Sequence, residues 1–205
     1  MALTVTTICL VRHGSVVGAE TQRFIGHLDV PLSRLGESQI SALAARLRHV
    51  RFDAIYCSDL TRTQRSAEIL AAPHGISPIA EPALREFAMG RWDGLTAEQI
   101  RSLDPDSFRA WMADVGRFKF PDGESLQDLE ARVLPAFDAI VDRHEGRTVA
   151  VVAHGGSNRA ILCRALGLGP ERLLALGQDY AALSVLSRRA ATWTLHSLNH
   201  CEPPR

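Results

Sequence analysis

The amino-acid sequence predicts an α/β protein in which a mostly parallel central sheet lies between two layers of helices. Three short runs of mostly apolar residues, 6–11, 52–57 and 148–153, are typical of buried strands. Helical patterns follow these runs along the chain, and strands that alternate with helices form a parallel sheet covered on both faces. The predicted architecture is therefore a three-layer α/β/α sandwich.

The first run leads into a helix with a clear start signal. Residues 6–11 stop at Arg12, and after a loop through Pro31 the side chain of Ser33 can cap a helix. The apolar positions of this helix recur every three to five residues, at Leu35, Ile40, Leu43 and Leu47. One face of the helix is therefore expected to pack on the sheet.

The other two runs lead into helices in the same way. Ser58 follows the second run and is a predicted cap for a helix from about residue 59 to residue 70. His154 and two glycines follow the third run and open a further helix. The apolar positions of that helix are Ile161, Leu162 and Leu166. The run at 6–11 is the expected central strand of the sheet.

The middle third of the chain is polar and irregular. Short helical patterns are interrupted at Gly90, Gly94, Pro105, Gly116, Pro121 and Gly123. Loops and small helices over one sheet edge are therefore expected here. Ser125 and Asp128 then resemble a capping box at the start of a longer helix. Two late strands, around 182–187 and 191–197, complete the predicted set.

Length and composition favour one domain over residues 1–200 with a tail at 201–205. The 205 residues are 46% hydrophobic and 22% charged, the mixture of a globular protein with a sizeable core. Because 23 Lys and Arg balance 23 Asp and Glu, no net charge attracts nucleic acid or an anionic membrane. The N-terminus predicts no signal peptide, and the dispersed cysteines predict reduced thiols in a cytoplasmic protein. Whether the chain forms a homodimer stays open.

Charged residues gather at the ends of the predicted strands, which is where ligands bind in open α/β sheets. Arg12, His13 and Gly14 end the first strand, Arg62 lies in the helix after the second, and His154 ends the third. Arginine forks bind phosphate oxygens, and a neutral imidazole can attack phosphorus to form a phosphoramidate that water hydrolyses. The set predicts phosphoryl transfer, with one histidine as nucleophile and the other as an electrostatic partner.

The motifs around these residues resemble the histidine phosphatase superfamily, the clan that contains cofactor-dependent phosphoglycerate mutase. The matching blocks stand in family order at 10–14, 26–33, 58–62, 84–86, 90–94, 123–125 and 151–156. Jointly these blocks are highly specific, and they span most of the chain. The resemblance implies a phosphoglycerate mutase-like fold.

The resemblance also implies roles for individual residues. His13 is the implied phosphorylated nucleophile, and Arg12, Arg62 and His154 are implied to surround the phosphoryl group. Glu86 is implied to protonate the leaving alkoxide, which leaves badly without a proton, and then to deprotonate the attacking water. The predicted substrate-binding residues are Arg12, Gly14, Ser15, Arg23, Phe24, Ile25, Gly26, Arg62 and Gly155. No cofactor and no metal ion is expected to take part.

Two comparisons with the family pattern bear on the reaction. Many relatives carry an asparagine six residues after the histidine, where this chain has Ala19, so that phosphate contact is absent. The block 87–92 is similar to the phosphatase branch, whereas mutases usually have a longer insert there. The expected function is hydrolysis of a small phosphorylated metabolite. The substrates left open are α-ribazole 5′-phosphate and sugar phosphates.

Other functions are separated by chemistry or by missing motifs. A cofactor-dependent phosphoglycerate mutase would pass the phosphoryl group from His13 to a sugar-acid hydroxyl instead of to water. A catalytically silent phosphate-binding regulatory module would turn over no phosphomonoester. A serine hydrolase is disfavoured because the G-x-S-x-G motif is missing, and zinc is disfavoured because no predicted helix carries an H-x-x-x-H or H-E-x-x-H pair.

Overall fold

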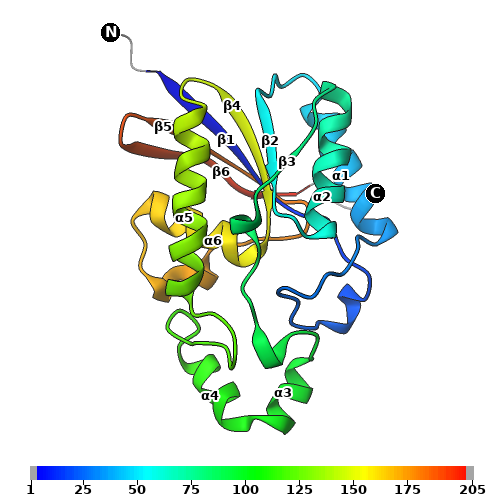
Figure 1. The fold of residues 1–205 in the computed structure, drawn as a ribbon, viewed down its shortest axis with the longest axis vertical. Coiled ribbons are helices and arrows are strands. Elements are labelled where there is room, and N and C mark those ends of the chain that lie inside the picture. Colours follow the sequence, from blue (N-terminus) through cyan, green and yellow to red (C-terminus); the bar gives the residue numbers. More distant parts are fainter. Residues whose placement is uncertain (1–3, 202–205) are drawn as a thin grey trace.

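A sheet of six strands runs through the centre of the computed structural model, which describes residues 4–201 (Figure 1). The strand order is β3-β2-β4-β1-β5-β6. The parallel strands are β1 (Val5–Arg12), β2 (Ala54–Cys57), β3 (Ile79–Ala80) and β4 (Thr148–Ala153). The antiparallel strands are β5 (Leu183–Arg189) and β6 (Thr192–His200). The predicted mostly parallel sheet is confirmed, and the two late strands extend it with antiparallel pairing.

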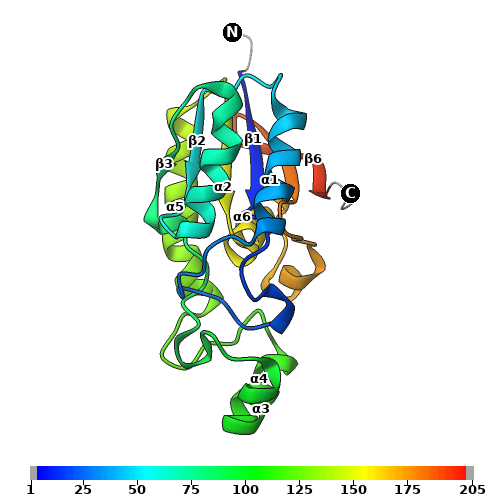
Figure 2. The same cartoon turned by 90° about the vertical axis from the view of Figure 1, so that its right-hand side faces the viewer.

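Helices cover both faces of this sheet, as the edge-on view in Figure 2 shows. One face carries α1 (Arg34–Leu47) and α2 (Thr61–Ala71), and the other carries α5 (Leu126–Arg143) and α6 (Gly155–Leu166). Successive residues of β1 join opposite sides of the core. Ile8 and Leu10 belong to the cluster with α5 and α6, whereas Cys9 and Val11 belong to the cluster with α1 and α2. The predicted α/β/α sandwich is confirmed.

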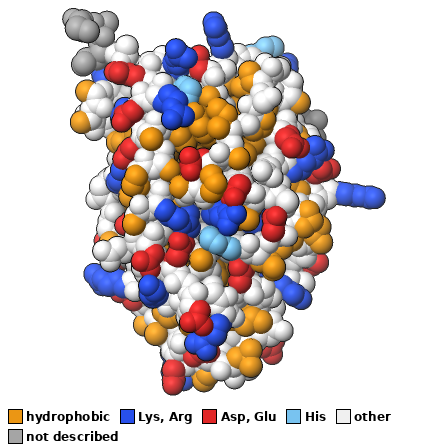
Figure 3. Space-filling model, viewed as in Figure 1, with side chains coloured by type: hydrophobic (Ala, Val, Ile, Leu, Met, Phe, Trp, Pro, Cys, Tyr) orange, Lys and Arg blue, Asp and Glu red, His pale blue; other side chains and the backbone are white. Residues whose placement is uncertain are grey.

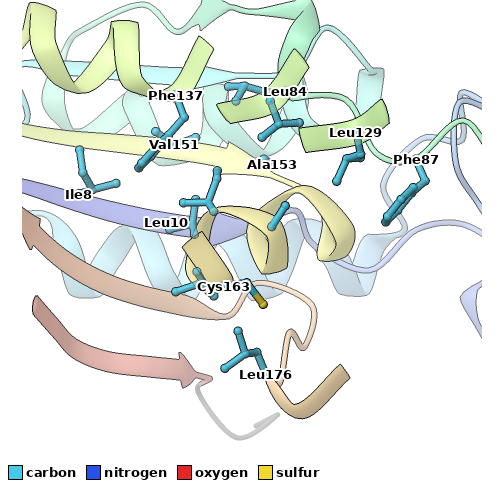
Figure 4. Packing of buried hydrophobic residues seen from close by; sticks show 14 of the residues in the cluster. Ile8, Leu10, Leu84, Phe87, Leu129, Phe137, Val151, Ala153, Cys163 and Leu176 are labelled. Atoms are coloured by element: carbon cyan, nitrogen blue, oxygen red, sulfur yellow. The ribbon is translucent and has the colours of Figure 1, made fainter. Parts of the chain in front are cut away.

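The cluster beneath α5 and α6 packs tightly against the centre of the sheet (Figure 4). Leu10, Phe137 and Val151 are each at most 1% exposed. Burying such a side chain is worth about 1.5–3 kcal/mol relative to leaving it in water. Because β1 and β4 pair over residues 7–12 and 148–153, their carboxyl ends lie side by side and fix the residues that follow.

The start signals in the sequence were right for α1 and α5 and wrong for α2. Ser33 Oγ accepts a hydrogen bond of 3.1 Å from the backbone N–H of Gly36 at the start of α1. The predicted capping box at 125–128 is also present. By contrast, the N-cap of α2 is Leu60, which has no side-chain cap, and Ser58 lies before it. Ser58 bonds to a residue of the site instead.

The middle third forms short elements beyond the carboxyl ends of the parallel strands. These are the 3-10 turns η3 (Pro82–Leu84) and η4 (Gly90–Trp92) and the helices α3 (Ala97–Leu103) and α4 (Pro105–Ala113). Figure 1 places α3 and α4 at one end of the molecule, away from the sheet. Aromatic contacts attach α4, since the ring of Phe24 lies 5.6 Å from that of Trp92 in η4 and 5.2 Å from that of Trp111 in α4.

Four short elements were not predicted. They are β3 and the 3-10 turns η1 (Ala19–Thr21), η2 (Ala72–His74) and η5 (Pro170–Ala175). Elements of two to six residues are too short for a hydrophobic period to mark them. The tail predicted at 201–205 lies, from residue 202 on, outside the described residues, as do residues 1–3 of the predicted leaderless N-terminus.

The surface matches the balanced charge of the sequence. In Figure 3 the acidic and basic side chains of one face are intermixed, without a broad area of a single sign. None of the helices between residues 4 and 201 combines the length and the apolar character needed to cross a bilayer.

Candidate active site

The imidazole rings of His13 and His154 meet beyond the carboxyl ends of β1 and β4. The ring centroids lie 5.1 Å apart, with 64° between the ring planes. Both rings are buried, at 5% and 0% exposure. The parallel register pairs Arg12 with Ala153, so the residue after each strand faces its counterpart. The tightly packed centre of the sheet therefore positions both histidines.

The hydrogen bond of His13 settles which ring nitrogen carries the proton. Nδ1 lies 2.8 Å from the carbonyl oxygen of Gly14, and a carbonyl oxygen can only accept. Nδ1 therefore donates, and Nε2 of the neutral ring keeps its lone pair. Burial, and then the charges of Arg12 and Arg62, lower the pKa of His13 well below its ordinary value. At neutral pH the side chain is an uncharged imidazole with a nucleophilic nitrogen.

His154 has a side-chain partner on each ring nitrogen. Arg62 Nε, which can only donate, lies 3.3 Å from Nδ1, so Nε2 carries the proton of the neutral ring and donates to Ser58 Oγ at 2.8 Å. Ser58 Oγ lies 2.6 Å from Thr63 Oγ1, which donates to the carbonyl oxygen of Leu60 at 2.8 Å. Burial, followed by the charge of Arg62, lowers the pKa of His154 well below its ordinary value. This chain of hydrogen bonds fixes the ring.

Arg62 enters the site from the first turn of α2 and is 1% exposed. Its Nη1 donates to the carbonyl oxygen of Leu28 at 2.9 Å and its Nη2 to that of Gly26 at 2.6 Å. With Nε on His154, three of the five N–H groups of a guanidinium are used and two are left for an anion. The N–H of Gly26 donates to Asp93 at 2.8 Å, which fixes the carbonyl that Arg62 needs.

Arg12 ends β1 and lies over the ring of Tyr180. Its guanidinium carbon is 4.0 Å from the ring centroid, and Nη1 donates to the carbonyl oxygen of Gln178 at 2.5 Å. Nε is buried and has no hydrogen-bond partner among residues 4–201. A buried N–H without an acceptor is unfavourable, so this edge of Arg12 is suited to an anion. Tyr180 belongs to no motif and was not predicted.

Glu86 lies against the first turn of α6 and is 8% exposed. Oε1 accepts the N–H of Phe87 and Oε2 accepts the N–H of Gly156, each at 2.9 Å. Gly156 is required there, because a Cβ atom would lie 2.2 Å from Glu86 Oε1. The carboxyl group is thus fixed beside the turn that carries His154.

Arg132 of α5 anchors the segment that carries Glu86. Its Nη1 donates to the carbonyl oxygens of Ala83 and Arg85 at 2.9 and 2.7 Å, and its Nη2 donates to that of Glu86 at 2.6 Å. The same guanidinium forms two 2.7 Å hydrogen bonds with Glu124. Burial raises the pKa of Glu124, but the bonds from Arg132 and a backbone N–H outweigh it and lower that pKa. No sequence motif singled out Arg132.

Gly14 and Ser15, predicted to bind substrate, have their backbone N–H groups on protein partners. Gly14 donates to Ser66 Oγ at 3.2 Å and Ser15 donates to Gln39 Oε1 at 3.0 Å. A Cβ on Gly14 would lie 2.4 Å from the carbonyl oxygen of Gly36, so this glycine lets α1 approach β1 closely. Their contact with substrate stays a prediction, and the structure leaves neither N–H free for it.

The predicted substrate segment 23–26 borders the site through Arg62. Arg23 is exposed and its guanidinium lies 3.4 Å from a backbone carbonyl oxygen. Phe24 belongs to the aromatic group that holds α4, and Ile25 is partly buried. Gly26 is buried and accepts from Arg62. Substrate contacts of these residues stay predictions.

The first turn of α6 presents a free donor and an unpredicted cation. The N–H of Gly155 makes no hydrogen bond to any residue between 4 and 201, and it lies at the positive end of a helix. A Cβ on Gly155 would lie 3.2 Å from Arg159 Nη1 and 3.7 Å from both Arg12 Nε and Glu86 Oε2. A guanidinium one turn after the last motif could have been found from helical spacing.

These groups together form an anion site. The free N–H groups belong to Arg12 and Arg62, whose charges act on His13, and to Gly155, which lies close to Arg12 Nε. This is the donor set that binds a tetrahedral oxyanion. Within the described residues, no three His, Cys, Asp or Glu side chains are grouped to hold a metal ion.

A sandwich fold with paired histidines and arginines at its strand ends defines a phosphoryl-transfer enzyme, and comparison with known families gives the same class. The sequence model of the histidine phosphatase superfamily (branch 1) matches residues 8–200. The chain belongs to this superfamily and is a phosphatase. The resemblance inferred from the motifs is confirmed.

Three similar proteins carry phosphatase names. Phosphoserine phosphatase 1 of Hydrogenobacter thermophilus is 33% identical over 179 residues, which cover 87% of this chain and 85% of that protein. A mycobacterial glucosyl-3-phosphoglycerate phosphatase structure has a TM-score of 0.87 and 31% identity, and the match covers 95% of this chain and 99% of that one. The α-ribazole phosphatase structure from Shigella flexneri has a TM-score of 0.86 and 25% identity, covering 95% and 96%.

Proposed function

We propose that this enzyme hydrolyses a small phosphomonoester through a covalent phosphohistidine on Nε2 of His13. The observation that carries the proposal is the hydrogen bond from His13 Nδ1 to Gly14, because it leaves a lone pair on Nε2 beside Arg12 and Arg62. The buried position of the ring keeps it uncharged, as an attacking nitrogen must be.

Binding of the phosphoryl group uses the unpaired donors of the site. The free N–H groups of Arg12, Arg62 and Gly155 meet the nonbridging oxygens. Because these donors are already held in place, they stabilise the charge of the transition state with little rearrangement. His154 contributes by holding Nε of Arg62, and its ring packs near that of His13.

In the first step, Nε2 of His13 forms a bond to phosphorus while the bond from phosphorus to the ester oxygen breaks. Glu86 in its acid form donates a proton to the leaving oxygen, and an alcohol departs. In the second step, Glu86 takes a proton from water as the water oxygen bonds to phosphorus. The bond from phosphorus to nitrogen breaks, inorganic phosphate is released, and the neutral imidazole is restored.

The substrate is a small phosphorylated metabolite. The names of the similar proteins span phosphoserine, α-ribazole phosphate and glucosyl-3-phosphoglycerate, which are all phosphomonoesters of alcohols. That range supports the class of reaction and leaves α-ribazole 5′-phosphate and sugar phosphates as substrates to be tested. A leaving alcohol needs a proton donor more than a phenol does, which agrees with the fixed position of Glu86.

A rapid-quench experiment with labelled phosphomonoesters tests the proposal. The wild-type enzyme is expected to form an acid-labile phosphoenzyme and to release inorganic phosphate, whereas His13→Ala forms no phosphoenzyme. Transfer to the hydroxyl of a phosphoglycerate faster than release of phosphate would indicate a mutase instead. Absence of turnover across a broad phosphomonoester panel would indicate a phosphate-binding regulatory module.

A further inference from the structure

Arg159 lies beside the site, yet the two steps proposed above do not use it. It follows Gly155 by about one helical turn of α6, and a side chain in that place covers the turn before it. Its Nη1 accordingly faces Gly155, at 3.2 Å from the position of a Cβ on that glycine. Its Nε donates to the carbonyl oxygen of Leu176 at 2.9 Å. The guanidinium is therefore held in place and half-buried.

Two cations share this corner. Arg12 Nε lies 3.7 Å from the same point next to Gly155. Burial lowers the pKa of Arg159 most, the charge of Glu86 raises it, and the charge of Arg12 lowers it, so the net effect is a lowered pKa. No carboxylate between residues 4 and 201 lies within ion-pair distance of Arg159, and both oxygens of Glu86 accept backbone N–H groups. Two neighbouring cations without an ion-paired carboxylate favour a bound anion.

The charges of the site leave one positive charge for a second anion. Arg12, Arg62 and Arg159 supply three, and a phosphate dianion accounts for two in the acid step proposed above, in which Glu86 is uncharged; Asp179 also acts on Arg159, but from beyond ion-pair distance. The remaining charge is at Arg159, next to the Glu86 carboxyl that protonates the leaving oxygen. A monoanion on the leaving alcohol would balance it, and a carboxylate is a monoanion that a planar guanidinium can bind through two parallel hydrogen bonds.

We propose that Arg159 is a specificity residue that binds a carboxylate on the alcohol part of the substrate. The enzyme is then selective for phosphomonoesters that are also carboxylic acids. This inference rests on the proposed phosphatase function, because it uses the position of the leaving oxygen beside Glu86. It predicts that loss of Arg159 changes the choice between substrates, and a contact with the phosphoryl group itself would not do that.

The test compares two substrates that differ in one group. 3-Phosphoglycerate has a carboxylate where glycerol 3-phosphate has a neutral CH₂OH. The measured quantity is the ratio of kcat/KM for these substrates in the wild type, in Arg159→Gln and in Arg159→Lys. We expect Arg159→Gln to lower the ratio by roughly tenfold or more, which is the effect of one charge-assisted hydrogen-bonded pair. Arg159→Lys, which keeps the charge but not the fork, should give an intermediate ratio.

Arg164→Gln is the matched control, because it makes the same substitution on the same helix. Arg164 is exposed and paired with Asp138, so its loss should leave the ratio as in the wild type. Equal losses on both substrates in Arg159→Gln would overturn the inference and give Arg159 a role at the phosphoryl group or in the fold. If the wild type forms no phosphohistidine, the proposed function fails, and that outcome is distinct from an unchanged ratio.

Discussion

The two sides of the active site are built in different ways. The proposed phosphate side, formed by Arg12, His13, Arg62 and His154, comes directly from the ends of buried strands and the first turn of α2. The proposed leaving-group side is formed by Glu86, which lies on an irregular segment anchored by Arg132, and by Arg159 of α6, whose Nε donates to the carbonyl oxygen of Leu176. Regular structure thus supplies most of the side chains for the phosphoryl group that all phosphomonoesters share. The proton donor for the alcohol part, which differs between phosphomonoesters, lies on an irregular segment that can vary.

The largest expected effect is on the phosphate side. Removing the proposed nucleophile in His13→Ala should lower kcat by about 10⁴-fold or more for every substrate, since the other histidine of the site, His154, has both ring nitrogens hydrogen-bonded to protein. Stopped-flow or discontinuous assays with an alkyl and an aryl phosphate check this. His49→Ala, at an exposed histidine in the turn after α1, is the control and should behave as wild type. Turnover through a phosphoenzyme on another residue would show that the phosphate side is not built around His13.

Arg62→Lys should have the next largest effect. A lysine cannot bind two carbonyl oxygens, His154 and an anion at once, so kcat/KM should fall about 10²- to 10³-fold. Because the loss concerns the phosphoryl group, alkyl and aryl phosphates should lose equally. A loss confined to alkyl phosphates would place Arg62 on the leaving-group side and contradict the division.

Glu86→Gln should act according to the leaving group. Without an acid, an alkyl phosphate should lose about 10²-fold or more in kcat, whereas p-nitrophenyl phosphate, whose phenolate leaves without a proton, should lose far less. Steady-state kinetics on glycerol 3-phosphate and p-nitrophenyl phosphate measure the difference. Equal slowing of both would remove Glu86 as the proton donor and with it the leaving-group side as described.

The same division explains what could be predicted from the sequence. The run 148–153 was predicted to the residue, and the runs 6–11 and 52–57 mark β1 and β2 to within one or two residues, because each is buried on both faces and ends at polar residues. His13, His154 and Arg62 follow from such ends, so their proximity needed only the rule that parallel strands present their carboxyl ends together.

The rest depends on contacts between residues far apart in the chain. Arg132 holds the carbonyl of Glu86 from 46 positions away, and Tyr180 lies over Arg12 from a loop before β5. No period or local motif encodes these pairs. Ser58 shows the opposite error, because a serine before a helix predicts a cap, whereas its hydroxyl is used by His154.

Ser58→Ala therefore tests whether this serine supports the phosphate side. The substitution leaves the buried Nε2–H of His154 without its acceptor, and the free energy of unfolding should fall by about 1–3 kcal/mol. Urea denaturation measures the change. Ser102→Ala, at an exposed serine that bonds its own helix, is the matched control and should change stability little. An equally small effect at Ser58 would show that the network does not fix the ring.

The pH dependence of stability gives the smallest expected effect. The folded-state pKa values of His13 and His154 are lowered, while in the unfolded chain each histidine titrates near about 6.5. Below that pH the unfolded state binds protons that the folded state excludes. The free energy of unfolding therefore decreases as the pH is lowered, by up to about 1.4 kcal/mol per pH unit for each histidine. Urea denaturation between about pH 5 and pH 7 should therefore show a shallower slope in His154→Gln than in the wild type. Identical slopes would mean that His154 accepts a proton in the folded enzyme, and its pairing with Arg62 Nε would then have to be replaced.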